Sequence, residues 1–314
     1  MKESRALAYL CFAIVCVVWG TTYLAIRIAI ETIPPFLLTG LRYTTAGVVM
    51  LVIARFRGEP MPRDRRVLGN LAFIGFLMVG VGNLAVVLAE QWVPSGMAAL
   101  LVSTAPFWIV VLESLREGGE RIDRRGVIGM IAGFGGVALL VTPSGPAGRF
   151  DAMFLLGALV VQIGSIGWQY GTIRGKYTAK ALPVVTSAGL QMLFGGLIVD
   201  VMGLALGEGP RLRFTPRTFG AIVYLALVGS VIAYTAYVYA TSHLRTTKMS
   251  LYAYVNPVVA VVLGWLVLDE RLTVVSVFAM VVILGGVAIV QSSGFRRSRF
   301  FTRETRLPAT RKAA

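Results

Sequence analysis

The sequence is organised as ten apolar runs separated by short charged stretches. A helix rises about 1.5 Å per residue, so roughly 20 apolar residues cross a hydrocarbon core about 30 Å thick. Backbone groups in lipid must be satisfied within their own segment, and these runs lack the strict alternation of barrel strands. We therefore predict an all-α integral membrane protein whose ten transmembrane helices cover residues 6–30, 34–54, 67–89, 97–115, 126–142, 153–173, 182–206, 219–240, 248–268 and 274–291.

Composition and charge placement agree with that fold class. Of the 314 residues, 56% are hydrophobic and 14% charged, against about 45–50% and 25% in soluble domains. The net charge of +15 comes from Lys and Arg, nearly all of which lie between the runs or after the last one. This distribution indicates lipid headgroups as partners, rather than a nucleic-acid groove. With both termini cytoplasmic, Lys and Arg favour the inner segments by 16 to 5 once the basic cytoplasmic tail at 292–314 is left out.

The two halves of the chain repeat each other in order. A shift of 149 residues aligns Trp19 with Trp168 and Gly58-Glu59 with Gly207-Glu208, and a shift of 151 aligns Pro106 with Pro257. We predict two repeats, at 6–142 and 153–291, each with five helices. An odd number of helices forces the second repeat to enter the membrane from the opposite side, and inverted repeats around a midplane site are common in secondary transporters. Duplication kept for packing alone is the alternative.

Several of these motifs resemble a known family. Trp19-Gly20, Arg42 within Gly-Leu-Arg-Tyr, Pro106, Tyr254-Val-Asn-Pro257, Asp269-Glu-Arg-Leu272 and the Gly-Gly-Val-Ala ends of helices five and ten are similar to the EamA family of the drug/metabolite transporter superfamily. Glu90-Gln-Trp-Val-Pro-Ser-Gly-Met-Ala-Ala99 resembles its bacterial drug/metabolite exporter branch. The resemblance implies the ten-helix inverted-repeat fold, a bacterial inner-membrane location and export of small metabolites.

Polar and aromatic side chains in the middle of spans are costly in lipid and usually face the bundle interior. Most of them fall on helices 1, 3 and 4 and on their counterparts 6, 8 and 9. We expect these helices to enclose a cavity for small amphipathic molecules, either aromatic or amino-acid-like, that stack on rings and accept scattered hydrogen bonds. The residues expected to line it are Trp19, Tyr23, Asn83, Ser103, Gln162, Trp168, Tyr234, Tyr237, Tyr252 and Asn256.

Prolines and embedded charges form a second group of candidates. Pro106 and Pro257 remove a backbone bond at matched positions, which predicts either hinges or static bends. Arg42 lies about eight residues into helix two, where it could bind a substrate carboxylate but is interpreted first as tied to helix-end carbonyls. Glu113 is expected to pair with Arg116, with proton coupling as the second interpretation. Glu90 and Asp200 pose the same question more weakly.

The sequence also excludes several activities. It has no Walker sequence for ATP hydrolysis, and its single histidine supplies neither a serine-protease nor a metalloprotease site. Cys11 and Cys16 are five residues apart, on different faces of a helix, and form no metal site. We predict a non-enzymatic, cofactor-free exporter, monomeric or homodimeric, driven by protons or by the substrate's own gradient. A passive facilitator, or a sensor or scaffold, is the alternative.

Overall fold

A computed structural model describes residues 2–115, 120–121, 123–141, 152–178, 182–244, 252–270, 272–292 and 296–297. Its first helical stretches are α1 (Lys2–Ala29), α2 (Pro35–Phe56), α3–η1–α4 (Arg65–Gly75, Phe76–Asn83, Leu84–Ala89), α5–α6 (Ser95–Val102, Ala105–Ser114) and α7 (Arg124–Val141). The second set is α8 (Ala152–Thr178), α9 (Val184–Ala205), α10–η3–α11 (Pro216–Tyr224, Leu225–Ile232, Ala233–His243), α13 (Tyr252–Leu268) and α14 (Val274–Ser292). Minor elements are η2 (Gly209–Arg211) and the antiparallel pair β1 (Glu120–Arg121) and β2 (Arg296–Arg297).

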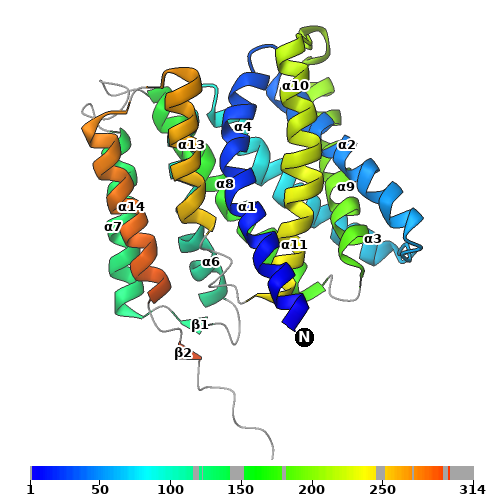
Figure 1. Cartoon of the computed structure of the whole chain (residues 1–314), viewed down its shortest axis with the longest axis horizontal. Coiled ribbons are helices and arrows are strands. Elements are labelled where there is room, and N and C mark those ends of the chain that lie inside the picture. Colours follow the sequence, from blue (N-terminus) through cyan, green and yellow to red (C-terminus); the bar gives the residue numbers. More distant parts are fainter. Residues whose placement is uncertain are drawn as a thin grey trace, which may run out of the picture.

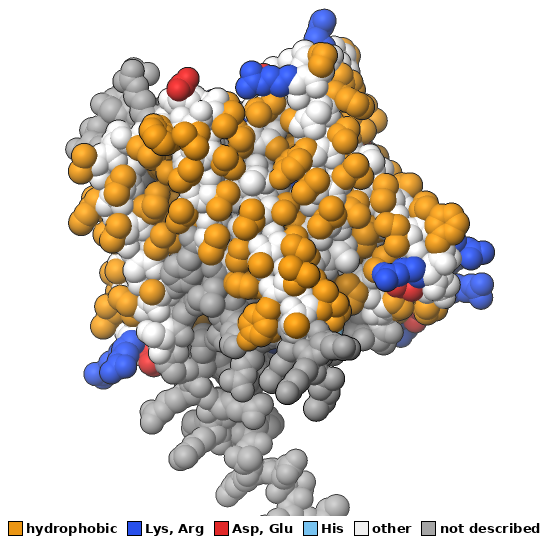
Figure 2. Space-filling view, viewed as in Figure 1, with side chains coloured by type: hydrophobic (Ala, Val, Ile, Leu, Met, Phe, Trp, Pro, Cys, Tyr) orange, Lys and Arg blue, Asp and Glu red, His pale blue; other side chains and the backbone are white. Residues whose placement is uncertain are grey.

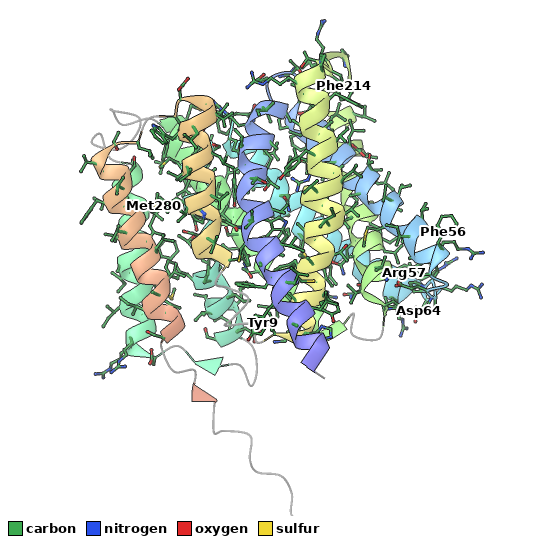
Figure 3. All side chains as sticks on the ribbon, viewed as in Figure 1. Tyr9, Phe56, Arg57, Asp64, Phe214 and Met280 are labelled. Carbon is green, nitrogen blue, oxygen red and sulfur yellow. The ribbon has the colours of Figure 1, made fainter. Side chains whose placement is uncertain are left out.

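The all-α membrane architecture expected from the apolar runs is confirmed. Seven of the described helical stretches are long and apolar enough to cross a membrane, and shorter apolar helices accompany them. Hydrophobic side chains cover the flank of the bundle in Figure 2. Charged groups lie at the margins of this hydrophobic surface, for example Arg57 and Asp64 at the turn between α2 and α3, at the right-hand edge of Figure 3. Asp64 caps α3 by accepting a 2.7 Å hydrogen bond from the Arg66 N–H.

The N-terminus of α1 and strand β2 lie at the same end of the bundle (Figure 1). We call this the terminal end and the opposite one the distal end. The C-terminal tail beyond Arg297 lies outside the described residues, as do the loop arginines Arg149, Arg245 and Arg271 that entered the charge comparison.

The inverted repeat is visible in how counterpart helices pack. Helices α2 and α9 occupy the same position in the two repeats and run antiparallel, with Gly47 against Leu193 and Gly196 against Thr44. Helices α7 and α14 are also counterparts and cross closely where Gly136 meets Ile283 and Gly286 meets Gly133. Small residues let backbones approach in this way. The two first helices of the repeats pack in the same way. Helix α1 packs on α13 and α10–α11, and its counterpart α8 packs on the corresponding helices of the first repeat, α6 and η1–α4.

Acidic residues at the helix ends reinforce the symmetry. Gly58 and Gly207 have φ values of 66° and 74°, the left-handed conformation in which glycine commonly ends a helix. The next residues, Glu59 and Glu208, then accept hydrogen bonds from the N-terminus of the counterpart helix: Glu59 from Thr186 N–H at 3.1 Å and Glu208 from Leu37 N–H at 2.9 Å. A carboxylate satisfies the free amides there and complements the positive end of the helix dipole.

Three irregularities were not predicted from the sequence. The third and eighth spans contain π-helical segments, η1 and η3, in their middle turns. Such segments are rare in proteins, and those that occur are often found at functional sites. The fourth span is broken at Ser103 and Thr104, so that Pro106 lies at the start of α6. Its counterpart Pro257 instead lies within the continuous helix α13. The matched prolines therefore have different structural effects.

Candidate substrate cavity

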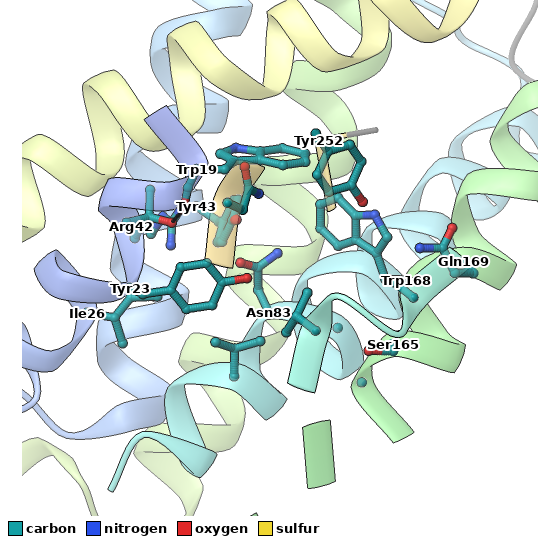
Figure 4. Close-up of a pocket in the computed structure, with 17 residues that line it drawn as sticks. Trp19, Tyr23, Ile26, Arg42, Tyr43, Asn83, Ser165, Trp168, Gln169 and Tyr252 are labelled. Carbon is teal, nitrogen blue, oxygen red and sulfur yellow. Dashed lines mark hydrogen bonds between the residues drawn. The ribbon is translucent and has the colours of Figure 1, made fainter. Parts of the chain in front are cut away.

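A cavity of about 80 Å³ lies in the middle of the bundle, between helices from both repeats (Figure 4). Its wall combines aromatic rings, amides and hydroxyls with a single charged group among the described lining residues. These residues are Trp19, Thr22, Tyr23, Ile26, Arg42, Tyr43, Gly82, Asn83, Val86, Val102, Ala105, Gly164, Ser165, Trp168, Gln169, Tyr252 and Asn256. Sites for drug-sized molecules usually exceed about 300 Å³, so in this conformation the cavity is contracted and the helices must separate to admit a larger ligand.

An aromatic cluster forms part of the cavity wall and extends beyond it. The Trp19 ring meets the Trp168 ring edge-on at 5.6 Å and the Tyr237 ring at 4.9 Å, measured between centroids. Tyr237 in turn meets Tyr252 at 6.1 Å, and Trp168 meets Tyr234 at 6.1 Å. Three of these four pairs are edge-to-face, a geometry that adds packing energy beyond the buried area. The two tryptophans that the repeat aligns are thus in direct contact at the boundary of the cavity.

Arg42 supplies the positive charge. Its side chain is 3% exposed, and its guanidinium lies 4.7 Å from the centre of the Tyr43 ring. Nε donates a 2.8 Å hydrogen bond to the Ser230 hydroxyl on η3, rather than to the helix-end carbonyls that the sequence interpretation favoured. A buried guanidinium has five N–H donors, so an arginine held in this way retains donors for an anionic group in the cavity.

Six of the ten residues predicted for the cavity line it. They are Trp19, Tyr23, Asn83, Trp168, Tyr252 and Asn256. Asn83 also donates to the Met78 carbonyl within η1 at 3.3 Å, a bond that helps satisfy the backbone of the π-helical segment.

The other four predicted residues make structural contacts beside the cavity. Ser103 donates to the Leu100 carbonyl at 2.6 Å, and Tyr234 donates to Gln191 Oε1 at 2.8 Å. Gln162 Oε1 accepts from the Trp108 indole at 2.8 Å, and Tyr237 OH lies 3.4 Å from the Thr172 hydroxyl.

Two further charged candidates, Glu113 and Asp200, do not line the cavity. Glu113 is half-buried near the end of α6, and its expected partner Arg116 lies outside the described residues. Asp200 on α9 accepts a 2.7 Å hydrogen bond from Thr44 on α2, so it joins the two counterpart helices. The side chain of Tyr254, part of the Tyr-Val-Asn-Pro motif, also lies outside the described residues.

The wall also contains residues outside the ten selected from the sequence. Thr22, Ser165 and Gln169 are mid-span polar residues that meet the polarity criterion. Tyr43 lies on α2, which is not among the six helices expected to enclose the cavity, and only its position next to Arg42 indicated a role. Gly82 has no side-chain signal; a Cβ there would lie 3.1 Å from the Trp168 side chain.

A ten-span, two-repeat helical bundle around a central polar cavity defines a multi-pass membrane transporter. Comparison with known proteins gives the family: the model of the EamA-like transporter family matches residues 6–142 and 155–292. The chain therefore belongs to the EamA-like transporter family, within the drug/metabolite transporter superfamily. It is a multi-pass inner-membrane transporter and not an enzyme.

Two bacterial relatives are named as transporters as well. The chain is 36% identical over 278 residues to the uncharacterized inner membrane transporter YedA of Escherichia coli strain K12, covering 87% of each chain. It is 22% identical to the uncharacterized transporter YoaV of Bacillus subtilis, covering 87% of this chain and 92% of the relative. A protein of known crystal structure shares the fold with a TM-score of 0.65 at 22% identity, over 91% of this chain and 97% of that one.

Proposed function

We propose that the protein is a secondary active exporter of small amphipathic metabolites that works by alternating access, with both termini cytoplasmic. Its substrates are aromatic or amino-acid-like compounds, and some drugs of similar chemistry. The observation that carries this proposal is the cavity itself, whose wall contains the rings of Trp19, Trp168 and Tyr252 and one buried guanidinium, that of Arg42. Rings bind flat apolar groups, and a desolvated arginine binds a carboxylate through charge-assisted hydrogen bonds.

The repeats supply the second half of the proposal. Two similar bundles of opposite polarity can exchange conformations, so that a cavity closed at one end opens at the other with little change in energy. Residues 6–142 and 153–291 would be the two exchanging units. The contracted volume of about 80 Å³ fits a conformation between the two open states.

Flux in proteoliposomes tests this function. We expect saturable uptake of an aromatic amino acid or a related carboxylate, accelerated when unlabelled compound is present on the other side of the membrane. A passive facilitator would show flux without that acceleration, and a sensor would show binding without flux. No transport of any compound in a panel of amino acids, aromatic acids and cationic drugs, at any imposed pH gradient, would contradict the proposal.

A further inference from the structure

Glu90 is a buried carboxyl group to which the proposed transport cycle assigns no role. It follows directly after α4, is 0% exposed, and neither carboxyl oxygen has a hydrogen-bond partner in the described part of the chain. The nearby Arg27 guanidinium donates to the backbone carbonyl of Glu90 instead. Buried carboxyl oxygens are normally hydrogen-bonded, so this pair of free oxygens needs an explanation.

Three other glutamates are hydrogen-bonded at helix N-termini, which makes the contrast with Glu90 sharp. Glu270, after α13, accepts from the Ser95 N–H and hydroxyl at 2.8 Å and from the Gly96 N–H at 3.1 Å, at the N-terminus of α5. Glu59 and Glu208 cap helices in the same manner. The motif 90–99 thus contains two different features. Ser95, the first residue of α5, is capped by Glu270, whereas Glu90, five residues earlier, has a carboxyl group that caps no helix.

Glu90 lies next to the distal wall of the cavity. Its N–H bonds to the carbonyl of Val86, one helical turn earlier, and Val86 lines the cavity. The ionisable groups that act on Glu90 are Tyr23 and Arg27 of α1, Arg42 of α2 and Glu270 after α13. Helix α8, packed on α4, has no ionisable side chain from residue 152 to 164.

Burial disfavours the ionised form of such a group. An ionised carboxylate loses its hydration when buried and needs hydrogen bonds or a close cation in return. Desolvation raises the pKa of Glu90 well above its ordinary value; Arg27 opposes this rise, Glu270 adds to it and Arg42 opposes it. The protonated form therefore suits the buried position of Glu90, and the ionised form requires water to reach the carboxyl group.

We propose that Glu90 is a proton-binding site that controls the distal end of the cavity. A proton taken from distal water forms the neutral carboxyl group, which can be buried as the distal end closes. Loss of that proton to water leaves a carboxylate that is stable only when the distal end opens. The inference rests on the proposed alternating-access function. It states that the proton binds preferentially to the conformation whose distal end is closed.

Thermal unfolding of the purified chain tests the proton site without any substrate. The folded pKa lies above the unfolded value of 4.5, so between the two values the folded state binds more protons and stability must fall as pH rises. We expect the apparent Tm of the wild type to fall as the pH is raised from 6 to 8. Glu90→Gln should remove this fall and unfold at a higher temperature than wild type at pH 8.

Matched variants and a second readout complete the test. Glu113→Gln, which neutralises a half-buried carboxyl group away from the cavity, should keep the wild-type pH profile, and Glu90→Asp should restore much of the pH dependence. Amide hydrogen exchange of residues 84–96, corrected for its intrinsic pH dependence, should accelerate at high pH in wild type but not in Glu90→Gln.

Unchanged pH profiles in Glu90→Gln, or a variant less stable than wild type at every pH, would overturn the proton site. Neither readout involves transport, so a failure of the flux assay would be recognised separately.

Discussion

Replacing Gly47 with leucine is expected to prevent the protein from folding. A Cβ on Gly47 would lie 2.5 Å from the backbone nitrogen of Leu193 on α9, closer than real Cβ contacts come. A backbone atom cannot rotate away as a side chain can, so α2 and α9 would have to separate along their whole contact. Overpacking of a well-packed core costs typically about 1–3 kcal/mol for extra methylenes, and a clash with backbone exceeds that range.

The repeat predicts the same outcome for Gly196→Leu, because a Cβ there would meet the Thr44 backbone nitrogen. Size-exclusion profiles in mild detergent should show aggregated material for both variants. Gly135→Leu and Gly285→Leu are the matched controls, since nothing lies within 4 Å of a Cβ at either position. A monodisperse Gly47→Leu protein with the wild-type Tm would show that the close α2–α9 crossing is not required.

Substituting Arg42 should produce the largest loss of transport with the fold retained. A hydrogen bond to a charged group contributes about 1.5–3 kcal/mol, so Arg42→Gln should raise KM for a carboxylate substrate about 10- to 100-fold. The neutral amide of the same compound lacks the anionic group and should be transported equally by variant and wild type. Arg42→Lys keeps the charge but loses the Nε bond to Ser230. Its KM for the carboxylate substrate should therefore lie between those of the wild type and Arg42→Gln.

Arg174→Gln is the control for Arg42. Arg174 lies on α8, where its Nε donates a 2.6 Å hydrogen bond to Asn70, and it does not line the cavity. Its KM values should match those of the wild type. Equal losses of acid and amide transport in Arg42→Gln would assign Arg42 a packing role and remove the basis for an anion-binding cavity.

The fold was largely predictable because lipid imposes strong rules. Length and polarity define a spanning helix, and the aligned pairs Trp19 with Trp168 and Gly47 with Gly196 indicate an inverted duplication from the amino-acid sequence alone. The π-helical segments were not predictable, because an extra residue in one turn barely disturbs an apolar run. Likewise Pro106 and Pro257 look equivalent in sequence, although only the fourth span is broken near its proline.

The residue types of the candidate site could be predicted from the sequence, but the hydrogen-bond partners of those residues could not. Polarity at mid-span identified Tyr23, Asn83 and Asn256, whereas the bond from Arg42 to Ser230 joins residues 188 positions apart, and sequence spacing carries no information about it. Glu90 illustrates the same limit. In the sequence Glu90 looks like Glu208 and Glu270. Only the packing of the helices shows that Glu208 and Glu270 cap helix N-termini, whereas the carboxyl group of Glu90 has no hydrogen-bond partner among the described residues.

Accessibility of a cavity-wall cysteine tests the central claim most directly. Ala105 lines the cavity and is 3% exposed, so we would introduce Ala105→Cys after replacing Cys11 and Cys16 by serine. A membrane-impermeant thiol reagent should label it from either side, in right-side-out and in inverted vesicles, and a transported compound should protect it. Gly135→Cys, on an open face of α7, should stay unlabelled. Labelling of Ala105→Cys from one side only, under every condition, would contradict alternating access through this cavity.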